Sequence, residues 1–289
     1  SVTGVQTCAL PISARWLKAG FAQKLEAAAI PNKKNLISFL GKRDFDLNRD
    51  YTLPWAGVIA GLAWNKVKLP KGIQTLEDKV HPERGLFSNP ALKGKIEVLS
   101  EMRDTVGLIL MFQGVDIAKP FPQAKWDNAL AYLQKKVKDG WIRQIKGQSY
   151  QEDMISGDAV AVIGWSGDIN QLNLQNQNKF EFGLPESGGT FSSDNMLIPV
   201  TSPNKAGAEA VMNYYYDPVV AARVANYINY VCPVNGAQEA MAKVNPINVK
   251  NPLIFPDQKM WSNLHVFRNL SGAEQISFAA SFQKVSGNA

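Results

Sequence analysis

The sequence contains few of the residues on which metalloproteins and most enzymes depend. Only two cysteines and two histidines occur among its 289 residues. Cys8 and Cys232 are too few for a disulfide framework or a multi-cysteine zinc site. His81 and His265 lie far apart, without cysteine, histidine or carboxylate neighbours at metal-ligand spacing. No Walker loop and no G-x-G-x-x-G follows a predicted strand, so we expect neither a metal nor a cofactor.

Long apolar runs and clustered charges are missing as well. No apolar run approaches the roughly 20 residues that are needed to cross a bilayer. The formal net charge is +6, but the basic residues are scattered and do not alternate with aromatic ones. We therefore expect no nucleic-acid partner. With 45% apolar and 19% charged residues, the composition is that of a globular protein with one large domain or two lobes.

The first residues differ in character from the rest of the chain. Residues 2–12, V-T-G-V-Q-T-C-A-L-P-I, carry no charge and show no helical or strand period. They resemble the translation of a common short-read sequencing adapter, which is a known contaminant of assembled genomes. We therefore expect residues 1–13 to be non-native, and the natural amino-terminal segment, with any export signal, to be missing from this sequence.

The most informative stretch is Ala159–Asp168, A-V-A-V-I-G-W-S-G-D. A continuous apolar run that ends at a glycine predicts a strand buried on both faces, as in a parallel sheet. Ligands of open α/β sheets bind just beyond the carboxyl ends of such strands, so Trp165 and its neighbours mark a candidate site. An ordinary turn with a packing tryptophan is the alternative. Strands alternate with helices elsewhere, including helices over 15–24 and 101–113, the latter with Ser100 as its N-cap, which indicates an α/β fold.

A hydrolase is the competing interpretation of this stretch. Gly164-Trp165-Ser166-Gly167 comes close to the G-x-S-x-G nucleophile elbow, but Asp168 stands where the pattern requires glycine. His265 is the one downstream histidine that could act as the base. A Ser-dependent hydrolase would therefore require Ser166 to lie beside His265.

Carboxylates and aromatic residues gather at the predicted ends of strands and helices. Glu101 and Asp104 are three residues apart at a helix start and share one face. Asp194 precedes a strand, and Trp165 and Tyr230 lie at similar junctions. Carboxylates bind ammonium groups through directed hydrogen bonds, and aromatic rings stack on alkyl chains and attract the cation. Each carboxylate alone is more often a cap or a solvated charge, but together they suit a small organic cation.

Five ordered motifs resemble those of the spermidine/putrescine-binding proteins, the extracellular solute-binding subunits of polyamine ABC importers. The likeness spans residues 15–285, and its specificity comes from the order and spacing of the motifs. They are D-Y-T-L-P-W-A-G-V-I-A-G-L-A-W-N (50–65), N-P-A-L-K-G-K-I-E-V-L-S-E-M-R-D (89–104), A-V-I-G-W-S-G-D (161–168), G-G-T-F-S-S-D-N-M-L-I-P (188–199) and Y-V-C-P-V-N (230–235).

The resemblance implies an α/β, two-lobed periplasmic-binding-protein type II fold with an incomplete N-terminal lobe. One lobe would comprise residues 14–58 and 194–238, and the other residues 59–193 and 239–289. The protein would capture putrescine or spermidine between the lobes and deliver it to the membrane permease. It would act as an exported monomer, in the periplasmic space or on the extracellular face of the cell membrane, and it would not be an enzyme. Another small organic solute, such as an amino acid, is the alternative ligand.

The resemblance also assigns roles to individual residues. Glu101 and Asp104 match the family's carboxylate pair, although the two side-chain lengths are swapped. Trp165 matches the central stacking tryptophan, Asp194 the amine-binding aspartate, and Tyr230 an aromatic wall.

Two further positions agree less well with the family. Arg268 aligns only loosely with a late polar ligand, and its charge would repel a polyamine. Ser192, beside Phe191, stands where the family often has a second tryptophan. The resemblance gives Ser166 and Asp168 no ligand role, which favours a turn at those residues.

Overall fold

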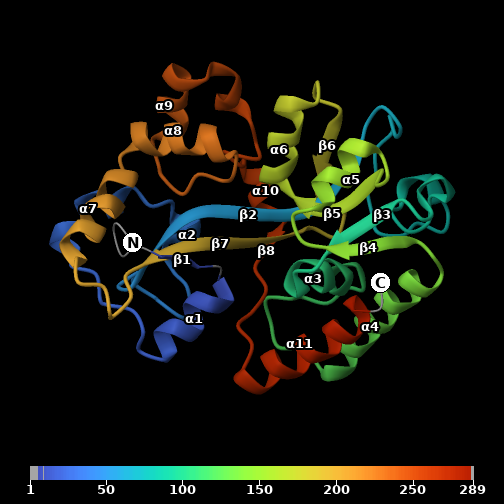
Figure 1. The fold of residues 1–289 in the computed structure, drawn as a ribbon, viewed down its shortest axis with the longest axis horizontal. Helices are drawn as coiled ribbons and strands as arrows, with labels where there is room; N and C mark the ends of the chain where they lie inside the picture. The colour runs from blue at the N-terminus through green and yellow to red at the C-terminus, as the bar shows by residue number, and fades with distance from the viewer. Residues whose placement is uncertain (1–5, 9, 288–289) are drawn as a thin grey trace. The chain divides into compact units, whose positions relative to one another are not determined.

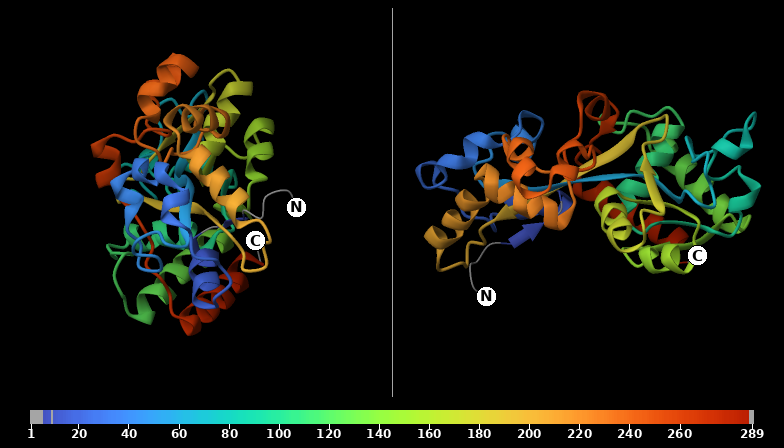
Figure 2. Two further views of the ribbon diagram at one scale, coloured as in Figure 1. Left: turned by 90° about the vertical axis from the view of Figure 1, so that its left-hand side faces the viewer. Right: turned by 90° about the horizontal axis from the view of Figure 1, so that it is seen from above.

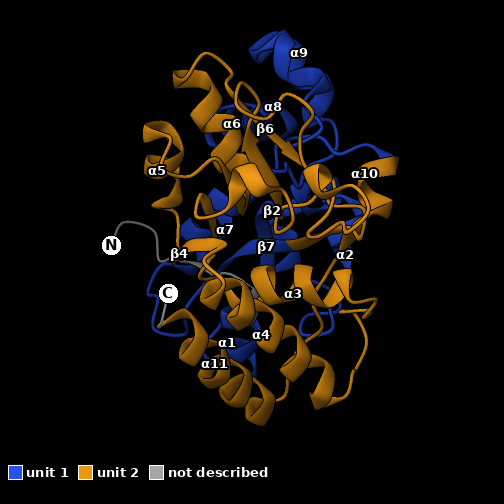
Figure 3. Ribbon diagram, turned by 90° about the vertical axis from the view of Figure 1, so that its right-hand side faces the viewer, with its two compact units in different colours: residues 1–58, 192–258 blue, residues 59–191, 259–289 orange. Residues whose placement is uncertain are grey.

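The computed structural model describes residues 6–8 and 10–287, in which strands and helices alternate as the sequence predicts. The chain divides into two compact units (Figure 3). Unit 1 comprises residues 1–58 and 192–258, and unit 2 comprises residues 59–191 and 259–289. Two strands, β2 (Thr52–Asn65) and β7 (Gly189–Leu197), run from one unit into the other. Figure 2 shows β2 as one long, continuous strand.

Unit 2 is built on a mixed sheet. Its strands, besides parts of β2 and β7, are β3 (Ile96–Leu99), β4 (Ile142–Lys146), β5 (Ala161–Trp165), β6 (Phe180–Gly183) and β8 (Leu264–His265). β5 pairs in parallel with β3, and β3 pairs in parallel with β4. On its other edge β5 pairs antiparallel with β2, which also pairs antiparallel with β6. The predicted buried strand is thus present, with one parallel and one antiparallel neighbour.

Helices cover both faces of this sheet. They are α3 (Met102–Phe112), α4 (Gln123–Lys138), α5 (Tyr150–Ser156), α6 (Ser166–Gln175), α10 (Gln258–Ser262) and α11 (Gly272–Ser286), with 3-10 turns η3 (Pro82–Arg84) and η4 (Pro90–Leu92). Figure 1 shows α3, α4 and α11 on one side of the strands, and α5 and α6 on the other.

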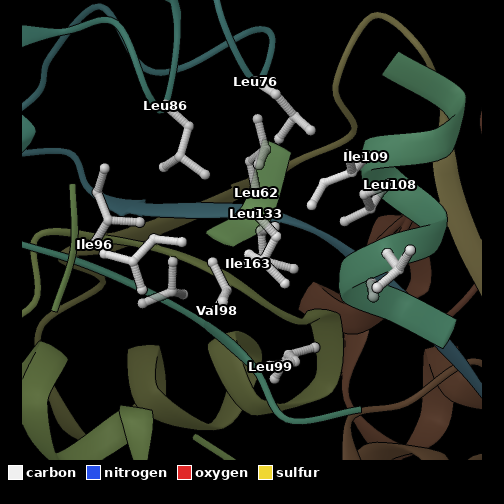
Figure 4. Close-up of a cluster of buried hydrophobic side chains, with 14 of the residues drawn as sticks. Leu62, Leu76, Leu86, Ile96, Val98, Leu99, Leu108, Ile109, Leu133 and Ile163 are labelled. Atoms are coloured by element: carbon white, nitrogen blue, oxygen red, sulfur yellow. The ribbon is translucent and has the colours of Figure 1, made fainter. Parts of the chain in front are cut away.

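The core of unit 2 lies between the sheet and α3. Leu62 of β2, Ile163 of β5 and Leu108 of α3 have no exposed surface (Figure 4). Full burial of such a side chain stabilises the fold by about 1.5–3 kcal/mol. This packing fixes the start of α3 relative to the end of β5.

Unit 1 has its own core and shorter strand pairings. β1 (Gln6–Cys8) pairs antiparallel with β7, and single bridges join Leu36 to Val234 and Gly57 to Val231. Its helices are α1 (Leu10–Lys18), α2 (Ser38–Gly41), α7 (Lys205–Tyr215), α8 (Pro218–Ile228) and α9 (Ala237–Val244), with η1 (Ala27–Ala29), η2 (Pro31–Asn35) and η5 (Pro246–Lys250).

The amino-terminal segment differs from its predicted structure. The sequence predicts no element before Arg15, but residues 6–8 form a strand and the first helix begins at Leu10. This helix ends at Lys18 rather than at residue 24, because Gly20 then takes a positive φ of 71°. The prediction that residues 1–13 are non-native falls partly on residues 1–5 and 9, which lie outside the described part of the chain.

The chain leaves unit 1 later than the sequence suggests. The resemblance places a crossing near residues 237–240, but the boundary between the units lies after Gln258. The reason is the packing of α9, whose residues Ala237 and Met241 are fully buried in the core of unit 1. Ile254 belongs to the same core, so residues 239–258 group with unit 1.

Candidate functional site

Asp104 is the centre of a hydrogen-bonded group at the start of α3. Its side chain is 7% exposed. The Trp165 indole Nε1 donates to Asp104 Oδ2 at 2.8 Å, and Thr190 Oγ1 donates to Oδ1 at 2.7 Å. The structure therefore brings together two of the predicted site residues, Asp104 and Trp165. It adds Thr190, which no pattern in the sequence singled out.

The Asp104 carboxyl lies in a desolvated environment. Burial raises the pKa of its carboxyl, while the hydrogen bonds from Trp165 and Thr190 and the charge of Arg103 act to lower that pKa. Among the ion pairs of the described residues, none includes Asp104. A buried carboxylate whose hydrogen-bond donors are all neutral is costly to ionise, which agrees with its raised pKa. A cation that reached this carboxylate would be held strongly.

Glu101 lies at the same helix end but, unlike Asp104, is an exposed residue. It is the N-cap residue of α3, in place of the predicted Ser100, but its side chain makes no capping hydrogen bond. Desolvation, followed by the charge of Asp104, raises the pKa of Glu101, and Arg103 opposes this shift. The Arg103 Nη2 donates to Gln275 Oε1 at 2.8 Å, so this guanidinium contacts α11. The two carboxylates thus form an acidic pair at the end of β3.

Trp165 is held at the junction of β5 and α6. Its backbone N–H donates to the Tyr150 hydroxyl at 3.0 Å, and that hydroxyl donates to Asp168 Oδ2 at 2.9 Å. The turn predicted at Ser166 and Asp168 is wrong, because both residues lie in the first turn of α6 and are fully buried. The strand therefore passes directly into a helix, with Trp165 half-buried between them.

The arrangement required for a serine hydrolase is absent from the described residues. Ser166 Oγ is buried and has no hydrogen-bond partner among them. His265 lies in β8, where its ring packs so closely on Gly188 that an added Cβ would meet it at 2.7 Å. Ser166 therefore has no general base, and the hydrolase interpretation is wrong.

The other two predicted site residues belong to unit 1. Asp194 lies on β7, is half-buried, and has no hydrogen-bond or ion-pair partner among the described residues. Burial raises the pKa of its carboxyl. Tyr230 is also half-buried and directly precedes Val231, which bridges Gly57. Asp194 thus matches Asp104 in being a desolvated acid that forms no ion pair with any residue the structure describes.

Arg268 and Phe191, two of the positions that depart from the family pattern, have other partners. The Arg268 guanidinium binds Glu274, with Nη2–Oε1 and Nη1–Oε2 distances of 2.6 and 3.2 Å, and lies over the Phe121 ring. Phe191 is buried and packs edge-on against Trp261. Ser192 is half-buried and contributes no aromatic surface. Arg268 therefore stabilises the start of α11, and Phe191 does not replace the missing tryptophan.

Further features of the described residues bear on function. No group of three or more His, Cys, Asp or Glu side chains among them could hold a metal ion. None of their helices combines the length and the apolar character that crossing a membrane requires. Cys232 is buried, and burial raises its pKa to about 12, so its thiol is unreactive at neutral pH.

Comparison with known protein families and sequences gives a consistent result. The model of the family described as bacterial extracellular solute-binding protein matches residues 11–254. The Putrescine/cadaverine-binding protein of Pseudomonas aeruginosa is 24% identical over 265 residues, which cover 90% of this chain and 73% of that protein. The Spermidine/putrescine-binding periplasmic protein of Escherichia coli is 24% identical over 270 residues, or 93% of this chain and 73% of that protein.

Solved structures share the fold. A putative spermidine/putrescine ABC transporter protein from Listeria monocytogenes superposes with a TM-score of 0.82 at 22% identity, covering 98% of this chain and 83% of that chain. A spermidine/putrescine substrate-binding protein from Streptococcus pneumoniae gives a TM-score of 0.80 at 20% identity, with the same coverage. The fold is the two-lobed fold of periplasmic binding proteins. The chain belongs to the bacterial extracellular solute-binding proteins and is a binding protein, not an enzyme.

Proposed function

We propose that this protein is the exported substrate-binding subunit of an ABC importer that captures a polyamine, putrescine or spermidine, and delivers it to the membrane permease. The protein would act as a monomer that closes on its ligand, as hinged binding proteins do. The names of the sequence relatives support a polyamine, and the family supports an exported binding protein.

The observation that carries this proposal is the environment of Asp104. A protonated amine is a donor with a full positive charge, which suits a buried carboxylate whose present donors are neutral. Charge-assisted hydrogen bonds of this kind stabilise a complex by about 1.5–3 kcal/mol. Glu101 and Asp194 supply further acids for a second ammonium group.

The remaining residues have complementary roles. Trp165 uses its indole N–H on Asp104, which leaves its ring faces for the methylene chain of the ligand and for cation–π attraction. Tyr230 would supply a second aromatic surface. We propose ligand contacts for Glu101, Asp104, Trp165, Asp194 and Tyr230.

Another small solute is the second candidate, because this fold holds different ligands. A binding protein from Agrobacterium tumefaciens in complex with agropinic acid gives a TM-score of 0.70 at 19% identity, covering 98% of this chain and 81% of that chain. A solute with a carboxylate group needs a cationic partner in the site. Arg268 is already paired with Glu274, and the predicted site residues are acids and aromatics. The charge of the site therefore favours a cation.

Isothermal titration calorimetry with putrescine, spermidine and several amino acids tests this function. We expect a polyamine to bind saturably and the amino acids not to bind. Trp165→Leu should abolish or strongly weaken binding, because it removes both the ring and one donor to Asp104. Trp141→Leu, a half-buried tryptophan elsewhere in unit 2, is the matched control. Binding of an amino acid in preference to every polyamine would refute the proposal.

A further inference from the structure

A buried tyrosine and a buried aspartate lie behind Trp165 in unit 2. Tyr150 begins α5 and is 1% exposed, and Asp168 lies in the first turn of α6 and is 0% exposed. The Tyr150 hydroxyl donates to Asp168 Oδ2 at 2.9 Å and accepts the backbone N–H of Trp165 at 3.0 Å. Gln148 Nε2 donates to Asp168 Oδ1 at 3.1 Å. The hydroxyl thus joins the end of β5 to the start of α6.

Gly164 makes this contact possible. A Cβ at position 164 would lie 3.0 Å from the Tyr150 hydroxyl oxygen and 3.1 Å from its ring carbon Cζ. Such distances are tighter than ordinary van der Waals contacts, so a larger residue would push the hydroxyl away from Trp165. The close approach of Tyr150 therefore explains why the residue before Trp165 in the G-W-S-G-D motif is a glycine.

The position of Asp168 also favours its charge. The first turn of a helix carries a partial positive charge, which stabilises a carboxylate there. Both carboxylate oxygens of Asp168 accept side-chain hydrogen bonds, from Tyr150 and from Gln148. The hydrogen bond to Asp168 orients the Tyr150 hydroxyl, whose oxygen then accepts the backbone N–H of Trp165.

We propose that Tyr150 and Asp168 are positioning residues that aim the Trp165 indole at Asp104. A buried acid and phenol at a strand–helix junction cost desolvation energy that apolar residues would avoid, and a positioning role accounts for them. The chain of contacts runs from Asp168 through the Tyr150 hydroxyl and the Trp165 backbone to Trp165 Nε1 and Asp104 Oδ2. The effect on ligand binding rests on the proposed function, but the effect on the indole does not.

Tyr150→Phe tests the proposal, because it keeps the ring and removes the hydroxyl. Tyr132→Phe is the matched control: it removes a hydroxyl that donates to Glu77 elsewhere in unit 2. The first readout is the ¹⁵N-indole resonance of Trp165 in the ligand-free protein, assigned with Trp165→Phe. The second readout is the Kd for putrescine at 25 °C.

We expect Tyr150→Phe to shift the indole resonance upfield and to speed its hydrogen exchange, since the bond to Asp104 loosens. Putrescine affinity should fall roughly 3- to 10-fold, which corresponds to the loss of about one buried hydrogen bond. Tyr132→Phe should change neither readout. Asp168→Asn keeps the side-chain volume and should change both readouts as Tyr150→Phe does. It is the variant to measure if Tyr150→Phe fails to fold.

The possible outcomes separate this inference from the proposed function. An unchanged indole resonance in Tyr150→Phe and Asp168→Asn overturns the positioning role, even if thermal stability falls. A wild-type protein that binds no polyamine refutes the proposed function, while the indole readout still decides the positioning role. A shifted indole with unchanged putrescine affinity overturns the link between positioning and binding.

Discussion

The Trp165 indole donates its N–H to the Asp104 carboxylate at 2.8 Å, although the two residues are 61 positions apart in the chain. Trp165, at the end of β5, thereby donates a hydrogen bond to Asp104 in the first turn of α3. Its edge is engaged, so it can offer a ligand only its faces. Asp104 in turn is oriented before any ligand arrives, which lowers the entropic cost of binding.

Thr190 should contribute to binding through Asp104. Thr190→Val keeps the shape of the side chain but removes the donor to Asp104 Oδ1. We expect a roughly 2- to 10-fold weaker Kd for putrescine, the effect of one lost hydrogen bond. Thr190→Ser retains the hydroxyl and should bind like the wild type. Equal affinities of the Val and Ser variants, measured by calorimetry, would show that the hydroxyl is irrelevant.

Polyamine binding should release protons and weaken in acid. Partial or full desolvation raises the pKa of Glu101, Asp104 and Asp194. An ammonium ligand stabilises the ionised carboxylates and lowers these pKa values, so each binding event displaces bound protons. Affinity should therefore fall as the pH drops. Calorimetry at about pH 5 in buffers of different ionisation enthalpy measures the proton number, and proton uptake would contradict the prediction.

Asp194 should bind one amine of the ligand. Asp194→Asn removes the charge from a half-buried carboxylate that has no ion-pair partner among the described residues. We expect a loss of about 1.5–3 kcal/mol of binding free energy, or roughly 10- to 150-fold in Kd. Asp44→Asn, at an exposed position of unit 1, is the control. An unchanged calorimetric affinity in Asp194→Asn would remove this residue from the site.

Glu97 should make the stability of the protein depend on pH. Its carboxylate is fully buried in β3, 3.6 Å from Arg143 Nε and 3.9 Å from Lys146 Nζ, and neither oxygen has a hydrogen-bond partner among the described residues. Burial and then Asp153 raise its pKa from 4.5 to about 7, although Lys146 and Arg143 oppose the shift. The folded state therefore binds this proton more tightly than the unfolded state does.

Ionisation of Glu97 should therefore destabilise the folded protein as the pH rises. Tighter proton binding by Glu97 stabilises the folded state fully below pH 4.5. This contribution to the free energy of unfolding is lost as the pH rises through about 7. Glu97→Gln, which cannot ionise, should be more stable than the wild type above pH 7, by up to a few kcal/mol. Denaturant unfolding at several pH values measures the difference. A difference that stays constant between about pH 5 and pH 8, as expected for the exposed control Glu152→Gln, would contradict the prediction.

The sequence predicted those parts of the structure that depend on local patterns. The apolar run before Trp165 has to be buried, and it forms β5; Glu101 and Asp104 are close in sequence, and they lie together at the start of α3. The sequence did not predict the roles of Thr190 and Tyr150, because these depend on contacts between elements that are far apart in the chain. The turn predicted at Asp168 was wrong because Ser166–Asp168 continue directly into α6, with the acid buried against Tyr150.

The most direct test of the proposed function is the calorimetric affinity of the wild type and of Asp104→Asn for putrescine at pH 7. This substitution keeps the volume of the side chain and one oxygen acceptor but removes the charge. We expect the wild type to bind and the variant to bind roughly 10- to 150-fold more weakly, while the exposed control Asp127→Asn is unaffected. Equal affinities of the wild type and Asp104→Asn would contradict the proposed function.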